Sequence, residues 1–263
     1  MNFLAEIGKF AIGRVLQVTH LAAIIAAVVY VGIWPRRWSR AMRQVLARQI
    51  LFSGFDAVFF IAFISLLIGV SVVVQANIWL GKVGQTQLLG PILVTVIIRE
   101  LGPLLANFVV IGRSGNAIAA ELGNMKVNGE VHLLDGMGLD PFVYLVMPRV
   151  IGFAVSVTCL TIIFFVVSLA SGYILSTFIG GGYALPPRDF IFKIGESLKP
   201  SDLVLLPVKT ILPALLAGAI CCTEGLSVSM AITDVPRATT LSLQRSAFGL
   251  FLISAMASFI SYL

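Results

Sequence analysis

Long apolar stretches dominate this sequence, and they restrict its fold more than any motif does. The stretch Phe55 to Trp79 runs for 25 residues with Asp56 as its single charged residue. About 20 consecutive apolar residues are enough for a helix to cross the hydrocarbon core of a bilayer. Of the 263 residues, 59% are hydrophobic and 11% charged, whereas soluble domains carry roughly a quarter charged residues. Because no soluble core could bury so much apolar surface, we predict an all-α integral membrane protein.

Five stretches are predicted to cross the membrane. They are Phe55 to Trp79, Leu88 to Ile111, Phe142 to Ile179, Leu203 to Cys222 and Phe248 to Leu263. The third could be one tilted span with an extension or two broken pieces, and the last is short for a full crossing. An earlier apolar stretch, Val15 to Trp34, contains Gln17 and His20, so it either crosses the membrane or only dips into it.

The basic residues predict the orientation. Much of the net charge of +6 comes from a run before the first clear span, made of Arg36, Arg37, Arg40, Arg43 and Arg48. Basic residues collect on the cytoplasmic side of membrane proteins, and tryptophans beside them suit an interfacial helix, here Pro35 to Gln49. We therefore interpret the charge as a membrane flank, not as a nucleic-acid surface.

Counting the 18 Lys and Arg residues extends this orientation to the loops. With the N-terminus inside, twelve lie on inner segments, and the outer loops hold Lys82, Arg188, Lys193 and Lys199. Residues 112–141 are then cytoplasmic and residues 180–200 form an outer loop. A crossing by Val15 to Trp34 would move only the N-terminus to the outside. We expect no signal peptide, because no early basic region precedes a small-residue cleavage site.

The loops have distinct local signals. The segment Gly112 to Pro141 is polar and helix-prone, with Ser114 predicted to cap a helix over Asn116 to Met125. The outer loop opens with three glycines and contains Pro186-Pro187, which predicts a loop followed by a short surface helix. Small residues spaced by four, as from Ser168 to Gly172 and along Ala214, Gly218 and Cys222, predict close helix packing. Cys159, Cys221 and Cys222 lack metal-ligand spacing, so we predict no metal site.

The most unusual local feature is the pair Arg99-Glu100 near the middle of the second span. A charged side chain at the centre of a membrane helix costs about 2.5–3.5 kcal/mol on insertion scales. Adjacent residues do not face each other on a helix, so these two cannot neutralise one another. Each therefore needs another partner, a water-filled cavity or a charged ligand. Pairing with neighbouring helices purely for assembly is the alternative interpretation.

Gly102-Pro103 follows this charged pair directly. Pro103 lacks an N–H group, so the carbonyl of Arg99 loses its helical hydrogen bond. A broken helix at membrane depth is tolerated only where it is buried in protein or lines a cavity. We therefore predict a helix break and a hinge at Gly102-Pro103, and we add Lys209 to the predicted site because it lies between Pro207 and Pro213. Asp56 and Glu224 lie near span ends, where a solvated flank is the simpler interpretation.

Evidence for an enzyme is weak. His132 and Asp135 share a helical face, but no nucleophile or set of metal ligands accompanies them. The chain has no G-x-x-x-x-G-K-[ST] phosphate loop, so we expect it not to bind ATP itself by that route. We predict no cofactor, and the catalytic set is empty.

The stretch IIRELGPLLANFVVIGRSGNAIAAELGNMKV, from Ile97 to Val127, resembles the MlaE-type permease family of ABC lipid transporters. This family includes the permeases of Mce systems and the plastid lipid importer. The resemblance continues in GMGLDPFVYLVMPRVIG, from Gly136 to Gly152, and returns in CTEGL and PRATT near the end of the chain. It covers about two thirds of the sequence, from Gln49 onward.

The resemblance implies an N-terminal elbow and interfacial helix over residues 1–54 and a permease domain over residues 55–263 with cytoplasmic coupling helices. It implies a homodimer in the inner (plasma) membrane that works with cytoplasmic ABC ATPase subunits and an MCE-domain lipid-binding protein. Phospholipids or related lipids would be the substrate. By the same resemblance, Arg99 and Glu100 would line the lipid cavity at the dimer interface. With Pro103 and Lys209 they form the predicted substrate-binding set. The residues expected to couple to the ATPase are Ser114, Glu121, Met125, Glu130 and Asp135.

The sequence departs from the family pattern at two places. The family usually carries Thr-Glu-Gln after the first coupling helix, where this chain has Asn128-Gly129-Glu130. The last span usually includes an Asp, and Phe248 to Leu263 has none. Two other functions stay open from the residues themselves: a secondary transporter in which Arg99 and Glu100 relay protons, and an intramembrane lipid enzyme.

Overall fold

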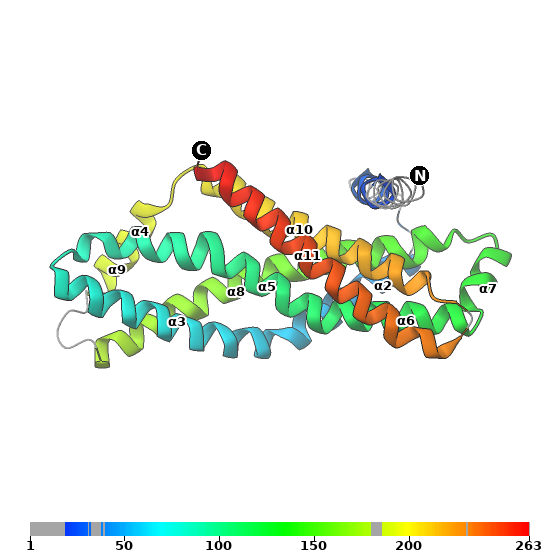
Figure 1. The fold of residues 1–263 in the computed structure, drawn as a ribbon, viewed down its shortest axis with the longest axis horizontal. Helices are drawn as coiled ribbons and strands as arrows, with labels where there is room; N and C mark the ends of the chain where they lie inside the picture. The colour runs from blue at the N-terminus through cyan, green and yellow to red at the C-terminus, as the bar shows by residue number, and fades with distance from the viewer. Residues whose placement is uncertain are drawn as a thin grey trace, which may run out of the picture.

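The fold is an elongated bundle of helices that run mostly along its long axis (Figure 1). The structure is a computed structural model, and it describes residues 19–30, 32, 38, 40–179, 186–229 and 231–262. Every regular element within these ranges is helical. Five helices are long and apolar enough to cross a membrane, which confirms the predicted all-α membrane class. They are Met42–Val83, Leu89–Val127, Phe142–Phe178, Asp202–Leu226 and Ile232–Ser261.

The first and third spans are each continuous. The first joins α2 (Arg40–Ile50), a π-helical turn η2 (Leu51–Phe55) and α3 (Asp56–Val83). The third joins η6 (Phe142–Val146) to α8 (Met147–Ile179), so a single span is right and the two broken pieces are wrong. The predicted domain boundary at residue 54/55 falls inside the first helical run and stays a prediction. Of the basic run, Arg36 and Arg37 lie outside the described residues, as does Trp34.

The second span is longer than predicted. After a short 3-10 turn, η3 (Thr86–Leu88), it passes through α4 (Leu89–Leu93), η4 (Val94–Leu101), α5 (Gly102–Val110), η5 (Ile111–Gly115) and α6 (Asn116–Val127). The predicted loop start at Gly112 is therefore wrong. Ser114 does not cap a helix: it is buried within this run, and its hydroxyl finds no hydrogen-bond partner among the described residues.

The second span also does not break at Pro103, so the predicted helix break is wrong. The two preceding turns are π-helical, and the Gly102 N–H donates to the Ile97 carbonyl, five residues back. Pro103 then stands in the first turn of α5, where a missing N–H costs little. The wider turn thus accommodates the proline by widening the helix instead of interrupting it. The hinge at Gly102-Pro103 stays a prediction.

The last span also begins earlier than predicted. After η7 (Ile232–Asp234), α11 runs over Val235–Tyr262, whereas the apolar stretch begins only at Phe248. The added turns contain polar residues, but Ala238, Ser242 and Ser246 are spaced by four and are buried. Here α11 packs against α6 and against α10 (Asp202–Leu226). Small side chains allow close helix contact in a membrane, so a stripe of serines can belong to a span.

Close helix packing is clearest between α3 and α8. A Cβ atom on Gly69 would lie 2.0 Å from the Ser168 carbonyl oxygen, and one on Gly172 would lie 2.5 Å from the Gly69 carbonyl oxygen. The two backbones are therefore in direct contact, as the Ser168 to Gly172 spacing predicts. Gly218 is similar, since a Cβ there would lie 3.3 Å from the Cα of Val150.

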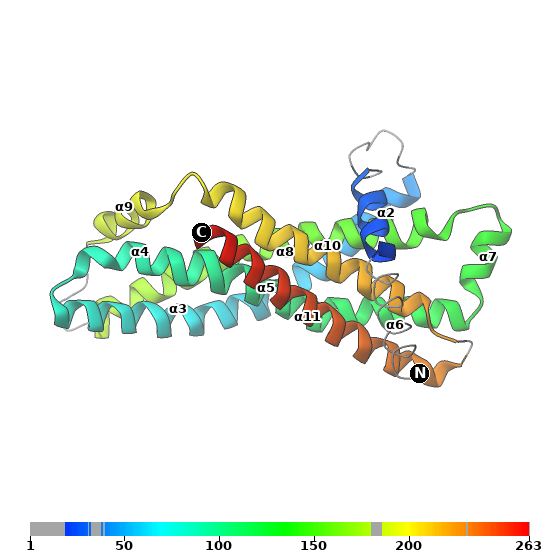
Figure 2. The same ribbon diagram turned by 45° about the horizontal axis from the view of Figure 1, so that its top comes forward.

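The two ends of the bundle are different. At one end lies α7 (Glu130–Gly136), a short helix with no buried residue. At the other lies α9 (Pro187–Ser197), which confirms the short surface helix predicted for the outer loop. Figures 1 and 2 show that α10 starts part-way along the bundle, beside the second span. The N-terminal apolar helix Thr19–Tyr30 is shorter than the five spans.

Candidate functional site

Arg99 and Glu100 lie on η4, in the first third of the second span, and each forms an ion pair with α10. The Arg99 Nε atom lies 2.8 Å from Asp202 Oδ1, and its NH2 group donates to Asp202 Oδ2 at 2.9 Å. The two side chains are only 12% and 4% exposed. Asp202 also accepts the Lys199 backbone N–H at 2.9 Å, so it holds both the guanidinium and the start of α10. The guanidinium is therefore already paired within the chain.

Glu100 pairs with Lys209, which lies two turns into α10. The Lys209 Nζ atom is 2.7 Å from Glu100 Oε1, and the two side chains are 1% and 33% exposed. The ammonium also donates to the Arg99 carbonyl at 3.0 Å and to Ser258 Oγ at 2.7 Å. Ser258 in turn donates to Glu100 Oε1 at 2.9 Å. All three N–H groups of the lysine therefore have acceptors.

One of these contacts compensates directly for Pro103. The proline leaves the Arg99 carbonyl without its usual helical donor, and the buried Lys209 ammonium supplies one from a different helix. Asn107 adds a second link, donating to the Pro103 carbonyl at 2.9 Å and to the Thr210 carbonyl at 3.3 Å. Side chains thus join the widened turn of the second span to α10, as membrane-buried polar groups require.

Arg99 and Glu100 were each expected to need another partner, a water-filled cavity or a charged ligand, and the structure shows the first of these. Each pairs with α10 of the same chain, which is the contact that the alternative interpretation, pairing for assembly, requires. The structure brings together Arg99, Glu100, Pro103 and Lys209, all of which the sequence singles out. Sequence reasoning missed Asp202 and Ser258. Asp202 lies seven residues before Lys209, two turns away on the same helical face, and this spacing was the available signal. The two pairs cancel in charge, and Glu100 is the most exposed of the four side chains. Contact of these groups with lipid stays a prediction.

The residues predicted to couple to an ATPase fall into two environments. Ser114 is buried within the second span, whereas Glu130 and Asp135 are exposed on α7. Glu121 and Met125 lie on α6, where Arg149 of α8 contacts both: its NH2 group is 2.8 Å from Glu121 Oε1 and 3.9 Å from Met125 Sδ. The Arg149 NH1 group also donates to the Leu145 carbonyl at 3.0 Å. Sequence reasoning missed Arg149, although it lies within the PR motif of the resemblance.

Other ties fix α6 to the helices around it. Lys126 donates to the Leu226 carbonyl at 2.5 Å, which joins the end of α6 to the end of α10. Glu224 of α10 pairs with Arg245 of α11 and is mostly buried, so its interpretation as a solvated flank was wrong. Asp56 is exposed, and its backbone carbonyl accepts a hydrogen bond from Arg113. The α7 end of the bundle is therefore held by ion pairs between helices.

Gly129, at the departure from the family pattern, lies in the turn between α6 and α7. Its φ is 78°, in the left-handed region that glycine adopts without steric cost. A side chain with a Cβ would strain this turn even though the space around it is open. The glycine is therefore explained by the backbone of the turn.

These features define a class of protein. Five helices are long and apolar enough to cross a membrane, and an ion-paired polar network joins three of them, the second span, α10 and α11. Charged residues buried within spans are typical of the membrane subunits of transporters. The sequence model of the family Permease MlaE matches residues 46–260, and the chain belongs to this family.

Named relatives agree with this assignment. A probable ABC transporter permease protein of Rickettsia conorii is 30% identical over 213 residues, covering 80% of each chain. One from Rickettsia bellii is 29% identical over 95% of this chain and 89% of the relative. Protein TRIGALACTOSYLDIACYLGLYCEROL 1, chloroplastic, of Arabidopsis thaliana is 29% identical over 74% of this chain, and the match spans 55% of that longer protein. The protein is therefore an ABC transporter permease of the MlaE family.

Proposed function

We propose that this permease moves phospholipids or related lipids between membranes, using ATP hydrolysed by a separate subunit. The observation that carries the proposal is the family match over residues 46–260, which includes every helix of the charged network. The name of the Arabidopsis relative refers to a glycolipid, which favours a lipid as the substrate class. The partners would be a second copy of the chain, two cytoplasmic ATPase subunits and an MCE-domain lipid-binding protein.

In this proposal the α7 end faces the cytoplasm. Lys126, Arg149 and Arg237 belong to helix segments near that end, whereas Arg188 and Lys193 lie on α9 at the other. The positive-inside rule then favours the inner (plasma) membrane orientation with α7 inside. The exposed surface of α7, with Glu130, Asp135 and the apolar Leu133 and Met137, would receive the ATPase, which binds the ATP. The permease itself would need no cofactor and perform no catalysis.

The charged network would act on the substrate. A lipid phosphate can accept charge-assisted hydrogen bonds from a guanidinium, so it would compete with Asp202 for Arg99. Glu100 is a third exposed and is held by Lys209 and Ser258, which suits a group that stays in place and polarises the lipid cavity expected at the interface of the proposed homodimer. Movement at Gly102-Pro103 would shift the carbonyl that Lys209 binds, and this would couple a hinge to the network.

Paired variants separate substrate contact from assembly. Arg99→Ala leaves Asp202 buried without its partner, so a loss of transport alone would be ambiguous. The double variant Arg99→Gln/Asp202→Asn removes both charges with little change in volume. We expect it to insert and to associate with the ATPase but to lose lipid transport in reconstituted vesicles. Normal transport by this double variant would exclude a role for the guanidinium in binding substrate.

A second candidate is a proton-coupled transporter, favoured by the partly exposed Glu100 beside a lysine. The two functions predict opposite responses to energy sources. A lipid permease driven by an ATPase should stop when ATP is depleted and should tolerate a protonophore. Transport that follows the proton gradient, by permease purified without any ATPase, would favour the second candidate and overturn the first.

A further inference from the structure

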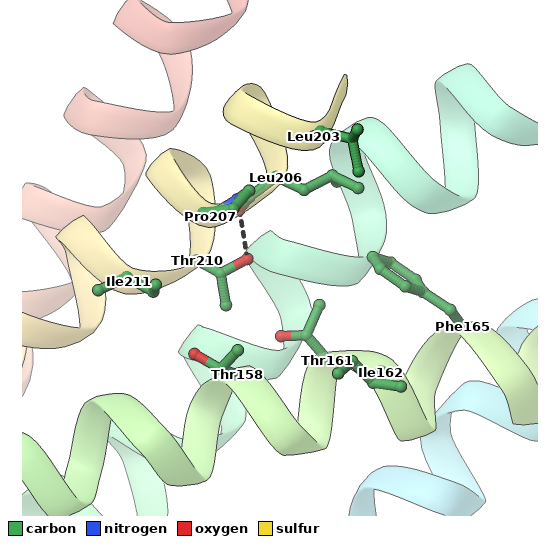
Figure 3. Close-up of a pocket in the computed structure, with 9 residues that line it drawn as sticks. All are labelled: Thr158, Thr161, Ile162, Phe165, Leu203, Leu206, Pro207, Thr210 and Ile211. Atoms are coloured by element: carbon green, nitrogen blue, oxygen red, sulfur yellow. Dashed lines mark hydrogen bonds between the residues drawn. The ribbon is translucent and has the colours of Figure 1, made fainter. Parts of the chain in front are cut away.

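A cavity separate from the charged network lies between α8 and α10. Its volume is about 250 Å³, and its walls come from residues 158–165 of α8 and 203–211 of α10 (Figure 3). Thr158, Thr161 and Thr210 line it, and each hydroxyl donates to the carbonyl four residues earlier in its own helix, at 2.7 or 2.8 Å. The threonines therefore present no unmet hydrogen-bonding group, and the remaining lining side chains are apolar.

The size of the cavity suits part of a lipid, not a whole one. A cavity of roughly 150 Å³ holds a benzene molecule, so one of about 250 Å³ has room for roughly ten carbon atoms. Sites that enclose an entire small ligand are larger, roughly 300–1,000 Å³. Along α10 the lining extends from Leu203 to Ile211, a rise of about 12 Å along the helix. This length and volume match part of one hydrocarbon chain.

The cavity lies between two membrane spans, at the surface of the bundle. Leu203 and Ile162 line it and are 78% and 57% exposed, although both belong to membrane spans. A space lined this way gives water no free hydrogen-bond donor and only the lone pairs of three threonine hydroxyls, whereas bilayer hydrocarbon can fill it without leaving an apolar medium. At the α10 start, the cavity adjoins the exposed link of residues 198–201, where Lys199 could face a lipid headgroup.

We infer that this cavity binds one acyl chain of a bilayer lipid, with its headgroup toward Lys199. The bound acyl chain lies against Phe165, whose ring forms one wall of the cavity. The ring also packs on Gly102, since a Cβ atom on Gly102 would lie 2.1 Å from the Phe165 Cε1 atom. The bound chain thus supports the ring that lies against the widened turn of the second span. The site is separate from the charged network and does not depend on the proposed transport function.

Photolabelling of the whole permease tests this site. The protein is reconstituted in phosphatidylethanolamine–phosphatidylglycerol nanodiscs that contain a phosphatidylcholine with a diazirine in one acyl chain, without ATP. We expect labelled residues in both walls, 158–165 and 203–211, at higher yield than around Ile174, which is exposed on α8 outside the cavity. Thr158→Phe and, from the opposite wall, Leu206→Trp should reduce the labelling to the level around Ile174. Ile174→Phe, which adds a ring to lipid-facing α8, should leave it unchanged.

Three results would overturn the inference. The first is equal labelling of the cavity and of the surface around Ile174 in the parent protein. The second is cavity labelling that survives both filling variants. The third comes from a photoreactive benzoylphenylalanine at position 162: cross-links to a second copy of the chain or to another protein would identify the occupant as protein. The labelling experiment contains no ATPase and measures no transport. If the cavity is labelled but the permease fails to transport lipid in a separate assay with its ATPase, only the proposed function is refuted.

Discussion

Replacing Lys209 by Met tests whether the polar network holds the second span to α10. The substitution keeps much of the side-chain volume but removes the ammonium. It leaves the Arg99 carbonyl and the Ser258 oxygen without the ammonium that donates to them at 3.0 and 2.7 Å. The Glu100 carboxylate loses its counter-ion at 2.7 Å and keeps the Ser258 hydroxyl as a donor. Of the four charged side chains Arg99, Glu100, Asp202 and Lys209, that of Lys209 is the least exposed. Water therefore cannot take the place of its ammonium group.

The expected magnitude follows from how exposed each partner is. Removing one member of a buried ion pair costs about 3–5 kcal/mol, because the other charge stays buried without a partner. Glu100 is 33% exposed and can regain some hydration, so we expect the lower end, about 3 kcal/mol. Adding Glu100→Gln to Lys209→Met removes the unpaired charge and should restore more than half of that loss. The two changes should therefore be strongly non-additive.

Equilibrium unfolding of the purified permease in mixed micelles measures these free energies. The control is Lys82→Met: Lys82 lies in the last turn of α3, in contact with the Trp79 ring, and should matter by less than about 0.5 kcal/mol. If Lys209→Met were as stable as Lys82→Met, the network would not hold the two helices together. Additive losses in the Lys209→Met/Glu100→Gln variant would also refute the reasoning, since they would mean that the two groups act independently.

Three further predictions concern packing and coupling. Arg149→Met removes the contact between α8 and the Glu121 carboxylate, so with the ATPase bound we expect ATP hydrolysis to continue while lipid transport falls; equal loss of both activities would contradict this. Gly129→Glu should destabilise the protein by about 1–2 kcal/mol, because Gly129 is in the left-handed conformation. Gly129→Asn should lower the stability less, and equal losses for the two variants in thermal unfolding would show that the conformation of this turn is unimportant. Gly69→Val should prevent the backbone contact with Ser168 and abolish monodisperse elution from a sizing column. Gly195→Ala, in the surface helix α9 with open space around it, should keep that elution. A Gly69→Val protein that elutes and unfolds like the parent would exclude that close contact.

Helix ends were predicted less well than helix cores, and the errors have a common cause. An apolar run marks where lipid surrounds a helix, but a helix can continue beyond that run when protein surrounds it. The second span continues through Gly112 and Ser114 to Val127 because α10 and α11 pack against α6. In the same way, Ser242 and Ser246 are buried in α11, although their polarity predicts a loop. Hydropathy cannot distinguish a polar residue in water from one packed between helices.

The site was predicted in outline. Intramembrane charge identified Arg99, Glu100 and Lys209, and the missing N–H of Pro103 identified the carbonyl that Lys209 binds. Their partners could not be assigned, because Asp202 follows a polar segment and Ser258 is one of several serines in α11. The continuity of the helix at Pro103 could not be predicted either. It depends on a π-helical turn that the packing of neighbouring helices stabilises.

The linear sequence determined the membrane class, the number of spans and the presence of charges that need partners, because these follow from transfer energies of single residues and short stretches. The three-dimensional packing decided which charges pair, where each helix ends and where the acyl-chain cavity lies. Those outcomes depend on residues about a hundred positions apart, such as Arg99 and Asp202, meeting across helices. No local sequence pattern shows how far apart two such residues lie in space, because small residues on the helices set how closely the helices approach.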